Sequence, residues 1–334
     1  MAANPTLYDV AREAGVSLAT ASRALNGSTR VVKAEYRDRV LAAAERLGYT
    51  ANLSAQAVAR GTSSTVALLV SDIADPYFSS IAAGVSRAAA AEGLTVTIAV
   101  TERDAELEIS LVRMLRGQRP RAIVLAGSRF TDEDDRGTLV AELRSFIGTG
   151  GRVSLISQDE LPFPTVSIDN SGGAARLAGE LVGLGYRGFG ILAGPENLAT
   201  ARDRATAFMG ALPHPPAAIV HGAFSRDAGY AGMMQLIEAG LGDLDAVFAV
   251  NDVMAVGALS ALRDRGIPVP DRVAVAGFDD IPMALDVTPP LTTVRVELEA
   301  AGAAALALAL GDGPAASTVR MPVEVVIRSS TPAR

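Results

Sequence analysis

Polar side chains in this 334-residue chain often follow apolar runs, the arrangement from which ligand sites at the edge of a parallel sheet are built. Acidic, amide, hydroxyl, guanidinium and aromatic groups could there bind a small molecule by hydrogen bonds and stacking. In sequence order these residues are Asp72, Asp75, Tyr77, Phe78, Ser128, Ser157, Gln158, Arg202, Arg204, Phe224, Asn251, Asp252, Asp279 and Asp280. For the acids the alternative role is a helix N-cap, which Asp252 fits well.

The same side chains offer no recognisable catalytic or metal-binding set. The chain has no Cys and only two His, His214 and His221, which excludes disulfides, Cys nucleophiles, thiolate metal sites and a His-rich metal site. Residues 188–193 fit the pattern G-x-G-x-x-A, but they lie within an apolar strand candidate instead of opening a helix, which argues against a dinucleotide site. We therefore expect no enzyme, no cofactor and no metal.

A second set of candidate residues lies near the N-terminus, where Thr20, Ser22 and Arg23 share the outer face of a predicted helix. Short hydroxyls and a guanidinium suit contacts with phosphates and base edges in the major groove of DNA, although a solvated helix face has the same composition. Residues 1–60 carry a net charge of +3, whereas residues 61–334 carry −10. Only the N-terminal part is therefore expected to meet a polyanion.

Short helices with a tight turn are predicted to position these N-terminal groups. Thr6 and Asp9 form a capping-box pattern, which predicts a helix that starts directly after Thr6. Gly15 can adopt the positive φ of a tight turn, and Ser17 is a suitable N-cap for a second helix at residues 18–25. A helix, a short Gly-containing turn and another helix form the helix-turn-helix pattern.

A third helix is expected from about Ala34 to Leu47, with Gly48 as its C-cap. Ala11 is small enough for the first two helices to cross closely. The core of this bundle is expected to consist of the aliphatic residues that face inward: Val10, Ala11, Ala14, Ala21, Leu25, Val40, Ala43, Ala44 and Leu47.

The rest of the chain alternates apolar strand candidates with helical stretches rich in Ala, Leu, Arg and Glu. The strand candidates are Val66–Val70, Leu94–Val100, Ala122–Ala126, Val153–Ser157, Phe189–Ala193, Ala217–Val220, Ala246–Val250 and Val273–Gly277. This alternation predicts an α/β fold with doubly wound parallel sheets, and at about 150 residues per domain the length favours two such units. Ligands of open parallel sheets bind at the carboxyl ends of the strands, so a cleft between the units is expected.

Residues 7–26, LYDVAREAGVSLATASRALN, resemble the helix-turn-helix of the lactose-repressor (LacI/GalR) family of bacterial transcription regulators. The resemblance continues through residues 40–61, VLAAAERLGYTANLSAQAVARG, and then over the whole body. It implies an all-α helix-turn-helix DNA-binding domain at residues 1–50, a hinge helix and linker at residues 51–61, and an effector-binding and dimerisation core at residues 62–334.

The core implied by this resemblance has the periplasmic-binding-protein type I fold, in which three crossovers join two doubly wound lobes. We place the first lobe at about residues 62–162 plus 291–321, and the second at about residues 163–290 plus 322–334. The crossovers would lie near Pro162–Thr165, Thr288–Leu291 and Met321–Val323.

The resemblance also assigns DNA contacts to positions of this sequence. Leu18 and Ala19 match the two recognition-helix positions that vary with operator sequence, and they could touch a thymine methyl group but make no bidentate base contact. Val58 stands where the family's hinge helix usually carries a Leu wedge, and Ala51 replaces a usual Pro. The implied DNA-binding residues are Thr6, Leu7, Ser17, Leu18, Ala19, Thr20, Ser22, Arg23, Asn26, Tyr49, Asn52, Ala55 and Val58.

Effector contacts are implied in the same way. Arg204, Asp252 and Asp279 match positions that hydrogen-bond effectors in relatives, and Phe224 matches an aromatic residue that stacks on the ligand. Charged groups around an aromatic ring suit a polyhydroxylated ligand, so a sugar or sugar derivative is expected, with a nucleobase as the alternative. The implied effector-binding residues are Asp72, Asp75, Tyr77, Phe78, Ser128, Ser157, Arg204, Phe224, Asn251, Asp252 and Asp279.

These features together predict a transcriptional repressor that binds a pseudo-palindromic operator as a homodimer and is controlled by a small-molecule effector. A solute-binding protein of a transport system is the alternative, against which residues 1–60 and an N-terminus without signal-peptide features argue. No apolar run reaches about 18 residues, so a cytoplasmic protein without a membrane span is expected. The C-terminal residues show no heptad pattern, which predicts a dimer without a tetramerising coiled coil.

Overall fold

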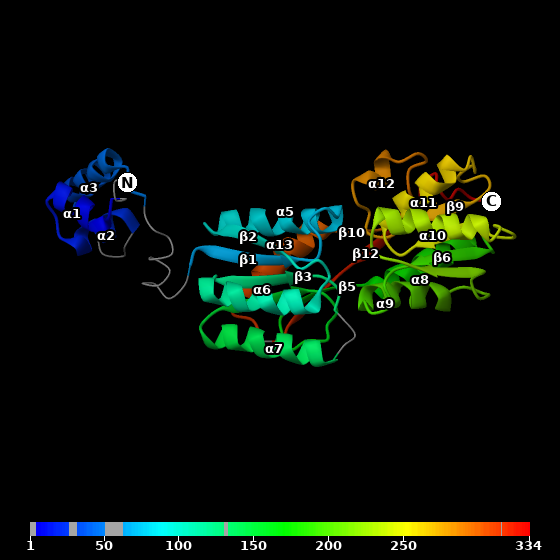
Figure 1. The fold of residues 1–334 in the computed structure, drawn as a ribbon, viewed down its shortest axis with the longest axis horizontal. Helices are drawn as coiled ribbons and strands as arrows, with labels where there is room; N and C mark the ends of the chain where they lie inside the picture. Colours follow the sequence, from blue (N-terminus) through cyan, green and yellow to red (C-terminus); the bar gives the residue numbers. More distant parts are fainter. Residues whose placement is uncertain (1–4, 27–31, 51–62, 130–132, 315) are drawn as a thin grey trace. The chain divides into compact units, whose positions relative to one another are not determined.

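The computed structural model describes residues 5–26, 32–50, 63–129, 133–314 and 316–334. The chain divides into two units, Met1–Ser63 and Ser64–Arg334 (Figure 1). The predicted hinge residues Asn52, Ala55 and Val58 lie outside the described residues. Within the described ranges, no helix is both long enough and apolar enough to cross a membrane.

The first unit is a bundle of three helices, α1 (Leu7–Ala14), α2 (Leu18–Asn26) and α3 (Ala34–Leu47), which confirms the prediction for this part of the chain. Leu25 and Leu47 pack against its core from partly buried positions. Because the core side chains are mostly alanines, the three helices can approach one another closely. The buried core consists of Val10, Ala11, Ala14, Ala21, Ala24, Val40, Ala43 and Ala44.

Local contacts set the turn that joins α1 to α2. The predicted capping box is present, since Thr6 Oγ1 accepts from the Asp9 amide at 3.4 Å and Asp9 Oδ2 accepts from the Thr6 amide at 3.0 Å. Gly15 ends α1 with a φ of +63°, a conformation that favours glycine. Ser17 Oγ accepts from the Thr20 amide at 3.1 Å and so caps α2.

The first lobe of the second unit is built on a six-stranded sheet of order β11-β5-β4-β3-β1-β2, in which all neighbours are parallel. The buried side chains of β1 alternate between two apolar clusters, one on each face of the sheet. The strands are β1 (Thr65–Val70), β2 (Thr95–Val100), β3 (Ala122–Ala126), β4 (Arg152–Ile156), β5 (Thr165–Ile168) and β11 (Thr318–Met321). Helices cover both faces: α5 (Pro76–Ala91) and α13 (Leu298–Leu310) on one, α6 (Ala105–Gln118) and α7 (Glu133–Gly148) on the other.

The second lobe has a four-stranded parallel sheet of order β7-β6-β8-β9. Its strands are β6 (Phe189–Ala193), β7 (Ala218–His221), β8 (Ala246–Ala249) and β9 (Ala274–Ala276). Its helices are α8 (Asn170–Gly183), α9 (Ala199–Gly210), α10 (Arg226–Glu238), α11 (Asp252–Asp264) and the short α12 (Met283–Asp286). A two-stranded antiparallel sheet of β10 (Thr293–Val296) and β12 (Val323–Val326) stands where the chain passes between the lobes.

Each of the predicted strands is present, with ends that lie within one residue of those expected. The strands that the prediction missed are β5, β10, β11 and β12, which are four residues long each. Such short segments, which include Thr, Ser, Arg or Glu, do not form the apolar runs that indicate a buried strand. The parallel doubly wound architecture agrees with the predicted fold class.

Two crossovers between the lobes lie later in the chain than the sequence predicts. Thr165–Ile168 pairs with β4 and β11, so the chain leaves the first lobe after Ile168 and not at Pro162–Thr165. Thr288–Leu291 precedes β10, and Arg295 of β10 forms a β-bridge with Asp279 in the loop after β9. The chain re-enters the first lobe only with α13, where the Ala305 carbonyl accepts from Ser154 Oγ of β4. The third passage lies between the end of β11 at Met321 and the start of β12 at Val323.

Candidate ligand cleft and nucleic-acid interface

A cleft lies between the two lobes of the second unit, near the carboxyl ends of their strands, as is usual for open parallel sheets. Its position agrees with the cleft expected from the polar residues that follow the predicted strands. The lining residues are Ser71, Asp75, Tyr77, Phe78, Arg103, Ser128, Leu198, Thr200, Arg204, Phe224, Asn251 and Asp279.

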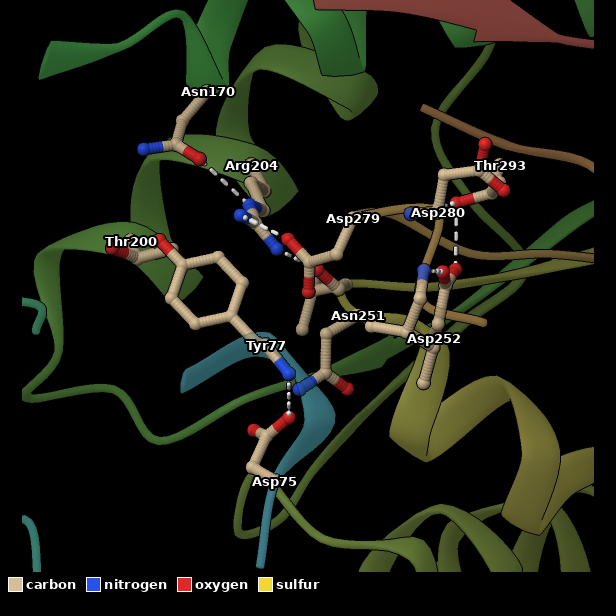
Figure 2. Close-up of polar contacts among 12 residues, drawn as sticks. Asp75, Tyr77, Asn170, Thr200, Arg204, Asn251, Asp252, Asp279, Asp280 and Thr293 are labelled. Carbon is tan, nitrogen blue, oxygen red and sulfur yellow. Dashed lines mark hydrogen bonds and ion pairs between the residues drawn. The ribbon is translucent and has the colours of Figure 1, made fainter. Parts of the chain in front are cut away.

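Arg204 on α9 is the cation of the second-lobe wall (Figure 2). Its buried guanidinium donates from Nε to Asn170 Oδ1 at 2.8 Å and from Nη1 to the Val250 carbonyl at 2.9 Å. It also donates from Nη2 to Asp279 Oδ1 at 2.8 Å. The Phe278 ring packs on the guanidinium, with 3.8 Å between Cζ and the ring centroid. These contacts hold the guanidinium in one orientation at the cleft.

Asp279 is the anionic partner of Arg204 and is held on a strained turn. Burial raises the pKa of Asp279 to about 7, although the neighbouring Arg204 acts to lower it. The backbone φ is +118° at Asp279 and +55° at Asp280, values that L side chains rarely adopt. Asp280 forms ion pairs with Arg295 at 2.8 Å and Arg328 at 2.7 Å, which hold this turn in place.

The first-lobe wall is formed by the start of α5 and by the segment after β2. Asp75 caps α5 by accepting from the Tyr77 amide at 3.0 Å, and burial raises the pKa of its carboxyl. Arg103 donates to Asp75 at 3.4 Å and to Asp72 at 3.3 Å. Its Cζ lies 5.9 Å from the centroid of the Phe224 ring, so Arg103 faces an aromatic residue of the other lobe.

Aromatic rings supply the apolar part of the cleft. The rings of Tyr77 and Phe78 meet edge to face with their centroids 4.9 Å apart. A β-carbon on Gly194 would stand 2.2 Å from the Phe224 ring, so glycine at that position leaves space for the ring. The cleft therefore combines flat apolar surfaces with paired charges, which can cover C–H faces and hydrogen-bond hydroxyls of one ligand.

Asp252, a predicted effector-binding residue, does not line the cleft. Its fully buried carboxyl accepts from Thr293 Oγ1 at 2.6 Å and from the Ile281 amide at 3.0 Å (Figure 2). Burial raises the pKa of Asp252 to about 6. The role of this carboxyl in the structure is to join α11 to the segments on either side of α12. Asn251, its neighbour, does line the cleft.

Asp72 and Ser157, also predicted to bind effector, are absent from the cleft lining as well. The Asp72 carboxylate accepts from Arg103, and Ser157 Oγ accepts from Arg129 Nε at 3.0 Å. Both side chains therefore hold neighbouring arginines in place, and Arg103, the partner of Asp72, is itself a lining residue of the cleft.

Four lining residues were not among the predicted set. Ser71 directly follows β1, so the rule that polar residues after strands face the cleft could have found it. Arg103 has a φ of +58°, a left-handed conformation that nothing in its sequence context indicates. Leu198 and Thr200 lie at the start of α9, the helix that carries Arg204, and only the packing of the lobes brings them to the cleft.

The first unit displays most of the predicted DNA-contacting residues on its surface. Leu18 is large and apolar yet 49% exposed at the start of α2, whereas Ala21, one turn further along the helix, is fully buried. Asn26 is the last residue of α2. The exposed residues of the set are Thr6, Ser17, Leu18, Ala19 and Arg23, and those partly buried are Leu7, Thr20, Ser22 and Tyr49.

Comparison with known proteins matches both units. The family described as "Bacterial regulatory proteins, lacI family" matches residues 6–52, and the "Periplasmic binding protein-like domain" matches residues 178–331. The transcriptional regulator GalS of Salmonella typhimurium is 35% identical over 297 residues, which cover 87% of this chain and 84% of that protein. The transcriptional repressor CytR of Escherichia coli is 32% identical over 339 residues, 98% of this chain and 96% of that protein.

Solved structures give the same result. The lac repressor dimer bound to operator and the anti-inducer ONPF matches with a TM-score of 0.86 at 28% identity, over 99% of this chain and 100% of that one. The complex of the transcriptional regulator CelR with cellobiose matches with a TM-score of 0.70 at 29% identity, over 98% of this chain and 99% of that one. These relatives are named as regulators, not as enzymes. With a helix-turn-helix bundle followed by a two-lobed unit, this chain belongs to the lacI family of bacterial transcriptional regulators.

Proposed function

We propose that this regulator is a repressor that binds a pseudo-palindromic operator as a dimer and is controlled by a sugar or sugar derivative in the cleft. The unit Met1–Ser63 would bind DNA, and the unit Ser64–Arg334 would bind the effector and dimerise. The observation that carries the effector class is the buried Arg204–Asp279 pair, which lines the same cleft as the aromatic ring of Phe224.

The chemistry of the cleft favours a neutral polyhydroxylated ligand. A carboxylate accepts from hydroxyl groups, a guanidinium donates to ring and hydroxyl oxygens, and an aromatic ring covers a C–H face. Arg204 is paired with Asp279, and Arg103 is paired with Asp72 and Asp75, so the two cations are already balanced by carboxylates. A phosphorylated ligand would add negative charge beside these carboxylates. The relative CelR was solved with cellobiose, a neutral sugar.

Exposed residues on α2 support the DNA-binding part of the proposal. Leu18, Ala19 and Arg23 are exposed; the two apolar side chains would contact thymine methyl groups in the major groove, and Arg23 would contact phosphates or base edges. One short recognition helix reads few base pairs, so two copies related by two-fold symmetry are needed for specificity. The related lac repressor was solved as a dimer on its operator.

Control by the effector follows from linkage. A ligand that binds one relative position of the lobes more tightly than another shifts the population toward it, and the first lobes transmit this shift to the DNA-binding units of the dimer. The coupling between effector and operator is expected to be about 1–3 kcal/mol, or roughly 5–150-fold in operator affinity.

A thermal-shift screen of the full chain against sugars, polyols, sugar phosphates and nucleobases tests the effector class. A ligand present at about 100 times its dissociation constant stabilises the protein by about 2.7 kcal/mol, which gives a measurable rise in Tm. We expect hits among neutral sugars. These hits should disappear in Arg204→Lys and persist in Asp264→Asn, a substitution at an exposed site on α11. Hits among nucleobases alone, which Phe224 could stack, would replace the sugar proposal, and hits that survive Arg204→Lys would contradict the role of the cleft.

A further inference from the structure

The N-terminus of α9 obtains its hydrogen-bond partners from the other lobe. The first amides of a helix have no intrahelical acceptors and need other partners. The second-lobe helices α8, α10 and α11 are capped by the side chains that directly precede them, Asp169, Ser225 and Asn251. α9 is preceded by Leu198, which supplies no side-chain cap.

First-lobe atoms take the place of that cap. The Ala199 amide donates to the Arg129 carbonyl at 3.1 Å, and the Thr200 amide donates to Ser128 Oγ at 2.9 Å. Gln158 Nε2 donates to Thr200 Oγ1 at 2.8 Å. Ser128 and Arg129 follow β3 and Gln158 follows β4, so two first-lobe loops hold the first residues of a second-lobe helix.

Buried Arg129 fixes the geometry of these loops. Its guanidinium forms a two-pronged ion pair with Glu108 on α6, with both N–O distances at 3.1 Å, and Nε donates to Ser157 Oγ at 3.0 Å. The side chains of both partners are almost completely buried. The Arg129 amide donates to Gln158 Oε1 at 2.9 Å, which leaves Gln158 Nε2 directed at Thr200. A buried ion pair of this kind demands good geometry on both sides, so it holds the loops firmly.

We propose that Ser128, Arg129 and Gln158 form a latch between the lobes, with Glu108 as the positioning residue that orients Arg129. Separation of the lobes at this point removes the cap of α9, the helix that carries Arg204, and therefore has a free-energy cost independent of any ligand. Ser128 and Thr200 also line the cleft, so the latch acts on the helix that the proposed effector would contact. The latch itself does not depend on the identity of the effector or on DNA binding.

Amide hydrogen exchange of the full chain without added ligand tests the latch. In the native protein the amides of Ala199 and Thr200 should exchange more slowly than unstructured amides, although the first turn of an isolated helix is not protected. Ser128→Ala should increase exchange at Thr200 roughly fivefold, the factor that corresponds to the loss of an N-cap of about 1 kcal/mol. Glu108→Gln should have the same effect at both amides, with exchange in β3 and β4 unchanged.

Glu142→Gln is the matched control, because Glu142 forms its ion pairs with Arg113 and Arg116, between α6 and α7, and not with a residue of the latch. It should leave the amides of Ala199 and Thr200 as in the native chain. Unprotected amides in the native protein, or exchange unchanged in both Ser128→Ala and Glu108→Gln, would overturn the latch. An effect of Ser128→Ala alone would overturn the positioning role of Glu108. If Glu108→Gln does not fold, Ser128→Ala still tests whether the first lobe caps α9, because this substitution removes only a hydroxyl.

Discussion

At the scale of residues, Asp252 and Asp279 have similar sequence contexts and different roles. Each is an Asp close behind a strand of the second lobe, and burial raises the pKa of each carboxyl. Asp279 pairs with Arg204 at the cleft, whereas Asp252 bonds to Thr293 and the Ile281 amide. A buried carboxyl needs hydrogen-bond partners in both cases, and the path of the backbone decides which partners these are.

The role of Asp252 gives a pH-dependent prediction for Asp252→Asn. A carboxyl whose pKa is higher in the folded chain than in the unfolded chain stabilises the fold below its ordinary pKa, and this stability is lost as the pH rises through about 6. The stability advantage of the native chain over the variant should therefore shrink between about pH 4 and about pH 7, by up to about 3 kcal/mol.

Urea unfolding of both chains across this pH range measures the difference. Asp264→Asn at the exposed end of the same helix, α11, is the control and should show no such change. A constant difference between the native chain and Asp252→Asn at all pH values would show that the carboxyl does not titrate in this range.

At the scale of elements, α2 and α9 are short helices whose functional positions depend on what surrounds them. α2 begins at a cap supplied by its own neighbour, Ser17, and its outer face is exposed. α9 begins at contacts from another lobe, made by Ser128 and the Arg129 carbonyl. Local sequence therefore predicts α2, whereas α9 needs the tertiary structure for its stability and for its place in the cleft.

The exposed face of α2 predicts that Arg23→Ala weakens DNA binding without loss of the fold. Because Arg23 is exposed, its truncation should leave the Tm and the ligand-induced thermal shift unchanged. Binding to a DNA duplex selected by the native chain from a random pool should weaken by about 1–3 kcal/mol.

Fluorescence anisotropy at several salt concentrations measures this loss, and Arg144→Ala on the exposed face of α7 controls for the removal of one positive charge. A simultaneous loss of ligand response in Arg23→Ala would mean that the side chain has a structural role instead.

At the scale of the whole molecule, two lobes of the same architecture are joined where β10 and β12 pair. Asp280 from the loop after β9 pairs with Arg295 of β10, and α13 continues from β10 to the first lobe. The turn that carries Asp279 is thus attached to a segment that passes between the lobes. If the proposed effector binds at Asp279, we expect it to bias the relative position of the lobes through this connection.

The whole-molecule proposal predicts two chains for each operator. Analytical ultracentrifugation of the full chain with the selected duplex should give this ratio, because each half-site contacts one recognition helix. A duplex with one half-site scrambled should bind far more weakly, by roughly 100-fold or more. One chain per duplex, with equal affinity for both duplexes, is the result that the proposal does not allow.

Elements that depend on local contacts and on hydrophobic period were predictable from the order of the amino acids alone. The helix-turn-helix, with the Thr6–Asp9 capping box, Gly15 and Ser17, and the long apolar strands were predicted because caps, turns and apolar runs act within a few residues. Eight of the residues that line the cleft were also predicted, because side chains that follow parallel strands meet at one edge and because the family resemblance assigns effector contacts to them.

Which of these residues face one another depends on contacts between segments that are far apart in the chain. The four-residue strands β5, β10, β11 and β12 form because neighbouring strands supply hydrogen bonds, and they shift two crossovers beyond the predicted places. Arg103 reaches the cleft through left-handed backbone, and Asp252 is buried where Thr293 and the Ile281 amide donate to its carboxyl. Contacts between distant segments carry no signal in a local pattern, which is the physical reason for each of these differences.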